Sequence, residues 1–162
     1  MPEPAGISIR RLLPDDWEEF RHIRLRALKD APHAFSSTLE EAVQLAEEEW
    51  RRRLGARAQF IALTGRATVG TAGGFDEEAR AHLISMWVDP GARRSGVGFR
   101  LVTEVADWAR GRGRRTLWLW VVEGNLAAER LYLRCGFDRT GKSQPVGSAD
   151  AARREFEMSL AL

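Results

Sequence analysis

The sequence has few of the residues that bind metals or form covalent cross-links. It contains one cysteine, Cys135, and three histidines among its 162 residues. A single cysteine cannot form a disulfide within the chain, and a structural zinc site needs several thiol or imidazole ligands close together. We therefore expect neither a disulfide nor a bound metal.

Long apolar runs are missing as well. No stretch approaches the roughly 18 consecutive apolar residues of a membrane-spanning helix. Residues 1–6 also lack the basic and then apolar pattern that is typical of a signal peptide. The sequence therefore predicts a cytoplasmic protein with no membrane partner.

Lysine is rare, because arginine provides 23 of the 25 basic residues. The 23 acidic residues reduce the net charge to +2, and acidic and basic runs stand side by side at 47–49 and 51–53. Nucleic-acid binding proteins instead gather their cations on one face, so we expect no nucleic-acid partner. The length, with 44% apolar and 30% charged residues, fits one globular domain over residues 1–162.

The spacing of apolar residues predicts alternating strands and helices. Alternation predicts a strand over 7–13, and helical spacing predicts a helix over 14–29. The hydroxyl residues 36–38 suit a helix cap, so a second helix is expected over 39–54. The remaining predictions are strands at 59–64, 68–75, 79–88, 116–122 and 155–160, helices at 96–111 and 126–134, and a loop at 141–150.

The most informative stretch is 86–102, in which an apolar strand, a loop with two arginines and two glycines, and a helix follow one another. Amide groups at a helix N-terminus have no intrahelical partner and carry partial positive charge, so this turn suits a phosphate group. Position 101 is leucine where a dinucleotide fingerprint needs glycine, and the Gly-Lys-Ser/Thr of a P-loop is absent. An ordinary glycine-rich connection with surface arginines is the alternative.

A second pattern, Asn-x-x-Ala-x-x-Leu-Tyr-x-x-x-Gly-Phe, covers residues 125–137. Asn125 and Tyr132 are seven residues apart, nearly two helical turns, so both side chains leave one face of the helix. Ala128 lies between them and is small enough for a ligand chain to pass. Taken alone, Tyr132 is more simply interpreted as a core aromatic residue.

Together the two patterns resemble the signatures of the GNAT superfamily of N-acetyltransferases, the first of them as Arg93-x-x-Gly96-x-Gly98. The resemblance covers roughly residues 80–140 and implies acetyl-CoA as cosubstrate. It implies an α/β (α+β) fold in which a mixed sheet of about six or seven strands is flanked by about four helices. In that fold the fourth and fifth strands are parallel and splay apart.

The resemblance also implies which residues meet the cofactor. The pantetheine arm would pair with the backbone of the strand around Met86 and Val88, whereas the alternation of the strand turns Trp87 to the opposite face. The pyrophosphate would rest on amides 94–99, helped by the charge of Arg93 or Arg94. The implied cofactor-binding residues are Met86, Trp87, Val88, Arg93, Arg94, Ser95, Gly96, Val97, Gly98, Phe99, Asn125 and Ala128.

The chemistry of acetyl transfer needs an oxyanion donor and an acid. A backbone N–H freed by a bulge in the strand 79–88 is the expected oxyanion donor. Tyr132, the only tyrosine of the chain, is the expected catalytic acid, since a phenol with a pKa of about 10 can protonate a leaving thiolate.

No motif identifies the general base. His82 and Glu123 are candidates, as are Glu40 and Glu41, and a chain of waters would also serve. In the family, the loop between the first two helices lines the acceptor site. The acceptor-site candidates are therefore His33, Phe35, Glu40 and Glu41.

The sequence thus predicts an acetyl-CoA-dependent N-acetyltransferase that acts on a primary amine in a ternary complex. A small-molecule amine is favoured, and the lack of a strongly acidic patch argues against polycationic acceptors. The alternatives are an acetyltransferase of protein N-termini or lysines and a non-catalytic acyl-CoA-binding module. Six tryptophans and many exposed strand positions are compatible with a homodimer.

Overall fold

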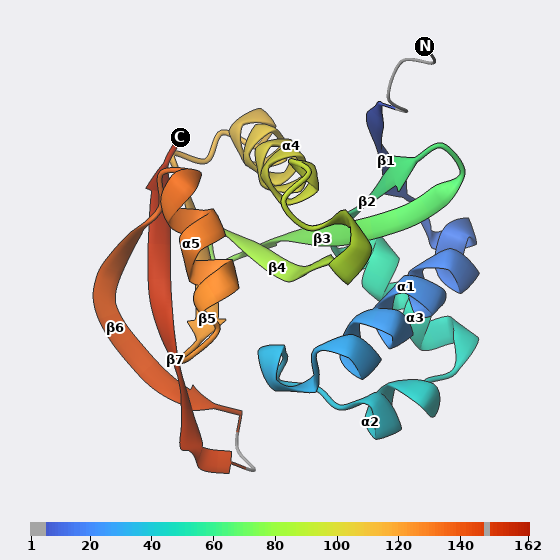
Figure 1. Ribbon diagram of the computed structural model, residues 1–162, viewed down its shortest axis with the longest axis horizontal. Coiled ribbons are helices and arrows are strands. Elements are labelled where there is room, and N and C mark those ends of the chain that lie inside the picture. Colours follow the sequence, from blue (N-terminus) through green and yellow to red (C-terminus); the bar gives the residue numbers. More distant parts are fainter. Residues whose placement is uncertain (1–5, 148–149) are drawn as a thin grey trace.

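A computed structural model describes residues 6–147 and 150–162, which form seven strands and five α-helices (Figure 1). The strands are β1 (Ile7–Leu12), β2 (Ala58–Thr64), β3 (Ala67–Glu77), β4 (Arg80–Val88), β5 (Thr116–Val122), β6 (Asp138–Val146) and β7 (Asp150–Ala161). The helices are α1 (Trp17–Asp30), α2 (Leu39–Val43), α3 (Glu47–Ala56), α4 (Val97–Gly111) and α5 (Leu126–Arg134), with 3-10 turns η1 (Pro14–Asp16), η2 (Pro32–Ala34) and η3 (Pro90–Ala92).

All seven strands join one mixed sheet in the order β1-β2-β3-β4-β5-β7-β6 within the described residues. The pair β4 and β5 is parallel and is matched at only two positions, Ala81 with Leu117 and His82 with Trp118. From Leu83 onward β4 therefore has no strand partner on the side of β5, so the two strands part toward their C-terminal ends. The parallel, splayed pair confirms the predicted fold class.

Two hydrophobic cores lie on opposite faces of the sheet. On one face, α1, α2 and α3 gather as the blue to teal helices of Figure 1, and the fully buried rings of Phe20 and Trp50 meet edge to face with centroids 5.4 Å apart. On the other face, α4 buries Leu101 and Val105 against the sheet. Alternate residues of one strand serve each core, which is why β2 reads as an apolar run.

The single helix expected over 39–54 is wrong, because the chain forms α2 and α3 with a break over 44–46. Thr38 caps α2, since its Oγ1 accepts a hydrogen bond from the N–H of Glu41 at 3.2 Å. A second N-terminus at 47–49 places three glutamates in the first turn of α3, where the helix dipole favours them. The break also lets Trp50 and Leu54 face the core, and it accounts for a fifth helix.

The loop expected over 141–150 is also wrong where the structure describes it. Residues 141–146 continue β6, and β7 begins at Asp150; residues 148–149 of the expected loop lie outside the described residues. Pro145 does not prevent the strand, because β6 lies at the edge of the sheet and pairs only with β7. The two strands make the long curved hairpin of Figure 1.

Among the described residues we find no helix with the length and apolar character needed to cross a bilayer.

Candidate active site

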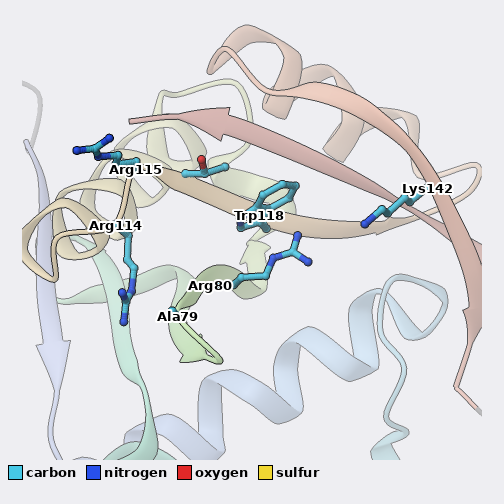
Figure 2. Close-up of a pocket in the computed structure, with 7 residues that line it drawn as sticks. Ala79, Arg80, Arg114, Arg115, Trp118 and Lys142 are labelled. Carbon is cyan, nitrogen blue, oxygen red and sulfur yellow. The ribbon is translucent and has the colours of Figure 1, made fainter.

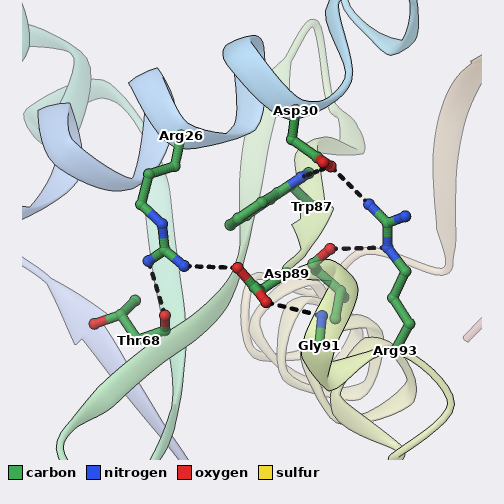
Figure 3. A network of polar contacts seen from close by, with 8 residues as sticks. Arg26, Asp30, Thr68, Trp87, Asp89, Gly91 and Arg93 are labelled. Atoms are coloured by element: carbon green, nitrogen blue, oxygen red, sulfur yellow. Dashed lines mark hydrogen bonds and ion pairs between the residues drawn. The ribbon is translucent and has the colours of Figure 1, made fainter.

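The loop between β4 and α4 is fastened to α1 and β3 through Asp89 (Figure 3). One carboxylate oxygen of Asp89 accepts a hydrogen bond from Arg26 Nη2 at 2.8 Å, and the other accepts from the N–H of Gly91 at 2.9 Å. Arg26 also donates to the carbonyl of Thr68 at 2.9 Å. The start of the loop is thus held at a fixed place beside the end of β4.

Asp30, the last residue of α1, makes the second fastening (Figure 3). Its Oδ2 accepts from Arg93 Nη2 at 2.8 Å and from Trp87 Nε1 at 2.9 Å. Arg93 also donates from Nε to the carbonyl of Val88 at 3.0 Å. Arg93, expected to offer charge to a pyrophosphate, is therefore folded back onto the end of β4.

The first turn of α4 leaves its amide groups open. Gly96, at the N-cap, has a φ of +90°, and its position makes no side-chain cap with the helix. The N–H groups of residues 97–99 have no intrahelical partner in such a turn. Ser95 turns its Oγ back to the carbonyl of Ala92. The exposed Arg94 makes no ion pair or hydrogen bond with the residues that the structure describes, so its charge is available to an anion.

The two glycines of the loop differ in their roles. A Cβ at Gly96 would have no heavy atom within 4 Å, whereas a Cβ at Gly98 would lie 2.8 Å from Leu131 Cδ2 of α5. Gly96 provides the left-handed backbone that starts the helix. A Cβ at Gly98 would press on the end of the Leu131 side chain, so this glycine eases the packing of α4 against α5.

β4 carries the expected bulge beside its unpaired edge. Thr71 of β3 is matched with Trp87, but Gly73 is matched with Ile84, so two residues of β4 oppose one residue of β3. Ser85, one of these two, has a φ of +55°. A bulge of this kind leaves a backbone group unpaired and turns it away from the ladder.

Side chains after the bulge alternate as the sequence predicts. Met86 and Val88 pack with the core beneath α4, whereas Trp87 is 5% exposed and packs with the core beneath α1 and α3. The indole of Trp87 thus lies in the core beneath α1 and α3, whereas its backbone belongs to the part of β4 that is unpaired on the side of β5.

Tyr132 is buried in α5, with 6% of its surface exposed and its ring 5.8 Å from that of Phe137. Its hydroxyl makes no hydrogen bond to any described residue. Burial, with a smaller effect of Cys135, raises the pKa of Tyr132 above its ordinary value of 10. The phenol thus keeps its proton at neutral pH, as an acid must.

Asn125 and Ala128 lie at the start of the same helix. Asn125 is the N-cap of α5, and its Oδ1 accepts from the N–H of Ala128 at 3.3 Å. The capping bond orients the side chain of Asn125, and its amide N–H groups make no hydrogen bond within the described chain. Ala128 packs partly buried against the core.

Residues 10–137 match the model of the Acetyltransferase (GNAT) family. The chain belongs to this family. A mycothiol acetyltransferase of Thermobispora bispora is 32% identical over 145 residues, which cover 84% of this chain and 48% of the relative. The chain thus spans about half the length of such curated relatives.

Solved GNAT structures share the fold. An acetyltransferase of the GNAT family from Streptococcus pneumoniae superposes with a TM-score of 0.81 at 22% identity, covering 97% of this chain and 99% of that one. The protein yncA of Salmonella typhimurium, solved with its cofactor acetyl-CoA, superposes with a TM-score of 0.78 at 19% identity, covering 97% and 94%.

The base candidates of this GNAT chain lie in different surroundings. His82 is half-buried at the joint between β4 and β5, and burial, with the charge of Arg80, lowers its pKa below 6.5. Glu123 is exposed just after β5, where its N–H donates to the carbonyl of Arg154 at 2.9 Å. The structure does not bring these two residues together.

The four acceptor-site candidates are only partly gathered. Phe35 is half-buried, and the guanidinium of Arg24 lies 4.5 Å from its ring centroid. The carbonyl of the exposed His33 accepts from Arg153 of β7. Glu40 and Glu41 are exposed on α2, and Glu41 accepts from the N–H of Thr38 at 3.3 Å as part of the cap.

β7 carries a buried carboxylate, Glu157, that the sequence patterns did not predict. The side chain of Glu157 is 2% exposed and accepts from Arg80 Nη2 at 3.1 Å and Thr140 Oγ1 at 2.8 Å. Its register partner is Trp120 of β5, on the face that α4 does not cover. No motif marks Glu157, because a carboxylate in an alternating strand ordinarily faces solvent.

A hollow of about 430 Å³ lies at the starting ends of β4 and β5 (Figure 2). Arg80 stacks on Trp118 there, with its guanidinium carbon 3.8 Å from the ring centroid. The hollow lies at the opposite end of β4 from the Gly96 loop, so it is separate from the phosphate-binding turn. Its lining residues are Ala79, Arg80, Arg114, Arg115, Thr116, Trp118 and Lys142.

Proposed function

We propose that this chain is an acetyl-CoA-dependent N-acetyltransferase that acts on a small primary amine. The observation that carries the proposal is the unpaired, bulged edge of β4, which ends at the open N-terminus of α4. An extended chain with polar amides can pair with such a strand edge. A pyrophosphate suits the turn that follows it.

The residues around this edge fit acetyl-CoA. The pantetheine arm would pair with the backbone near Met86 and Val88, and Asn125 would hold its inner end. The amides of residues 94–99 and the free guanidinium of Arg94 would bind the pyrophosphate. Because Arg93 is committed to Asp30, we assign the direct charge to Arg94 rather than Arg93.

The acetyl group would then lie beside the bulge of β4. A neutral amine attacks the thioester carbonyl, and the oxyanion that forms is stabilised by the backbone N–H that the bulge releases. The ammonium nitrogen of this tetrahedral intermediate loses a proton to a base, and as the C–S bond breaks, Tyr132 donates its proton to the leaving thiolate. The raised pKa of Tyr132 keeps it in the acidic form throughout the physiological range.

Of the base candidates we favour His82. It lies in β4, and its lowered pKa keeps the imidazole neutral near pH 7. Glu123 and Glu40 are exposed, and Glu41 is engaged in the cap of α2. A water chain that ends at His82 would serve equally, since a proton can pass through one water.

The experiment is an acetylation assay that measures free CoA thiol with a panel of primary amines. Tyr132→Phe should lower the rate by a factor of about 10² or more, because it removes one proton donor while keeping the ring. The variant should bind acetyl-CoA and melt as the wild type does. An unchanged rate would refute the acid role of Tyr132. Transfer only to protein N-termini or lysines would show that the acceptor is a protein rather than a small amine. The absence of any transfer would favour a non-catalytic acyl-CoA-binding module.

A further inference from the structure

Arg24 is a half-buried cation that makes no ion pair with a carboxylate among the described residues. It leaves α1 toward α2, where its Nη2 donates to Ser37 Oγ at 2.9 Å. Its Nη1 is buried and has no hydrogen-bond partner among the residues that the structure describes. Buried charges in proteins are ordinarily paired, so this guanidinium lacks the anion that its position calls for.

Arg57, just after α3, repeats this arrangement beside the bulge of β4. Its Nη1 donates to Ser85 Oγ at 3.3 Å, and its Nε is buried without a partner within the described chain. Burial lowers the pKa of Arg24 and that of Arg57 to about 10 each, and the charge of Arg57 lowers the pKa of Arg24 further. Arg57 thus lies beside the bulge of β4, and Arg24 is close enough to Arg57 for the two charges to repel each other.

The nearby carboxylates are otherwise engaged. Glu49 pairs with Arg53 at 3.1 Å and with Arg52 at 2.7 Å, and Glu41 belongs to the cap of α2. A cavity of about 40 Å³ opens beside Arg24. It suits a group of a few heavy atoms. Its lining residues are Arg24, Ser37, Glu41, Ala42, Leu45 and Arg53.

We infer that the acceptor is an amine that carries a carboxylate, and that Arg24 and Arg57 bind this carboxylate while the amine faces the bulge at Ser85. The inference rests on the proposed acetyltransferase function. A planar carboxylate matches the fork of a guanidinium with two parallel hydrogen bonds. Cationic acceptors such as polyamines are disfavoured, because they would add positive charge beside two half-buried arginines.

Arg57 connects the carboxylate site with the reacting centre. Because Arg57 contacts Ser85 of the bulge, a carboxylate on Arg57 lies only a few atoms from the amine. The chemical class is therefore a short amino acid, in which amine and carboxylate are close, rather than a long chain with a distant acid.

The first test compares amino acids with their carboxamides in the thiol-release assay on the wild-type protein. The two hardly differ in size, so the ratio of their rates, each expressed per concentration of neutral amine, isolates the carboxylate. We expect kcat/KM to favour the acids by at least about 30-fold, which is the usual effect of losing one partner of a buried charge pair. Equal or faster turnover of the carboxamides would overturn the inference while leaving the acetyltransferase function intact.

The second test replaces Arg24 by methionine, which keeps the length of the side chain without the charge. Arg24→Met should reduce kcat/KM for the acids by at least about 30-fold and leave the carboxamides unchanged. Its melting temperature is measured alongside, because Arg24→Met also removes the hydrogen bond to Ser37 and the contact with the ring of Phe35. Arg52→Met, on the exposed side of α3, is the matched control. It should change kcat/KM neither for the acids nor for the carboxamides.

A binding measurement separates the inference from catalysis. Millimolar amino acid, without acetyl-CoA, should raise the melting temperature of the wild type and of Arg52→Met but not of Arg24→Met. If no amine is acetylated but this shift is seen, the carboxylate site stands and the proposed function fails. A shift that Arg24→Met retains would overturn the site.

Discussion

Arg93 and Arg94 stand next to each other in the loop before α4 but have different surroundings. Arg93 is paired with Asp30 and bonded to the carbonyl of Val88, so it holds the loop. Arg94 has a φ of +63° and an exposed side chain. The motif names an arginine at position 93, and only the three-dimensional contacts show that its neighbour is the free one.

Removal of Arg94 should therefore weaken cofactor binding without harming the fold. We expect Arg94→Ala to raise KM for acetyl-CoA by about tenfold or more, as for the loss of one hydrogen bond to a charged group, with kcat unchanged. Steady-state kinetics check this. The matched control is Arg66→Ala, an exposed arginine in the turn between β2 and β3, which should leave KM as it is. A rise of KM for Arg66→Ala as large as that for Arg94→Ala would indicate a general charge effect.

Motifs predict only part of the site at this scale. Tyr132, Asn125 and the loop glycines lie within short continuous patterns, so their spacing could be read along the chain. Arg24, Arg57 and Glu157 come from three distant segments, and each meets its partner (Ser37, Ser85 and Arg80, respectively) only in the folded chain. No spacing pattern in the sequence predicts that these residues are buried or which partners they have.

Among the elements, the connection from α4 to β5 depends on Asp76 at the end of β3. The carboxylate of Asp76 is 5% exposed and accepts from Arg112 Nε at 2.7 Å and Arg114 Nη2 at 2.9 Å. Hydrogen bonds from Arg114, followed by those from Arg112, lower the pKa of Asp76 below its ordinary value of 3.8. The pair of arginines thus joins the C-terminal end of α4 to the middle of the sheet.

Asp76→Ala should reduce the free energy of unfolding by about 2 kcal/mol at pH 7, since it leaves two arginines without their acceptor. The native pKa is the lower one, so this contribution is complete above pH 3.8 and is lost as pH falls through the native value. Urea unfolding at pH 7 and pH 3 should show the difference between wild type and variant shrinking. Asp107→Ala, which removes the exposed pair with Arg110, should cost less than about 0.5 kcal/mol at either pH.

The two wrong predictions of secondary structure, the single helix over 39–54 and the loop over 141–150, have the same physical cause. The break between α2 and α3 contains neither glycine nor proline, so local propensity does not show it; the burial of Trp50 against Phe20 decides it. Likewise β6 contains Gly141 and Pro145, which are typical of loops, but pairing with β7 supplies the stability that the composition lacks. In both places tertiary contacts prevail over local preference.

At the scale of the whole molecule, the sheet consists of two parts that meet at two residue pairs. The parallel pair of β4 and β5 was predictable because the family resemblance implies it. The proposed acceptor side was not predictable, because it is assembled from distant segments: α1, the loop after it, and α3. A ligand in the gap between β4 and β5 would contact both parts of the sheet at once.

Acetyl-CoA should therefore stabilise the entire fold. At about 100 times its Kd it should raise the free energy of unfolding by about 2.7 kcal/mol, which corresponds to about 5–10 °C in Tm for a chain of this size. Thermal melting over a series of acetyl-CoA concentrations checks this. Arg94→Ala should need a higher concentration for the same shift, and a Tm that does not move at saturating acetyl-CoA would contradict the cofactor site.

The arginines of both sites have a chemical consequence for a chain that holds an activated acyl group. A thioester acylates neutral amines, and a guanidinium stays protonated in proteins. The cations named in the cofactor loop and in the carboxylate site are arginines, and the two lysines of the sequence, Lys29 and Lys142, are not among them. Prolonged exposure to acetyl-CoA would leave the charges of both sites unmodified.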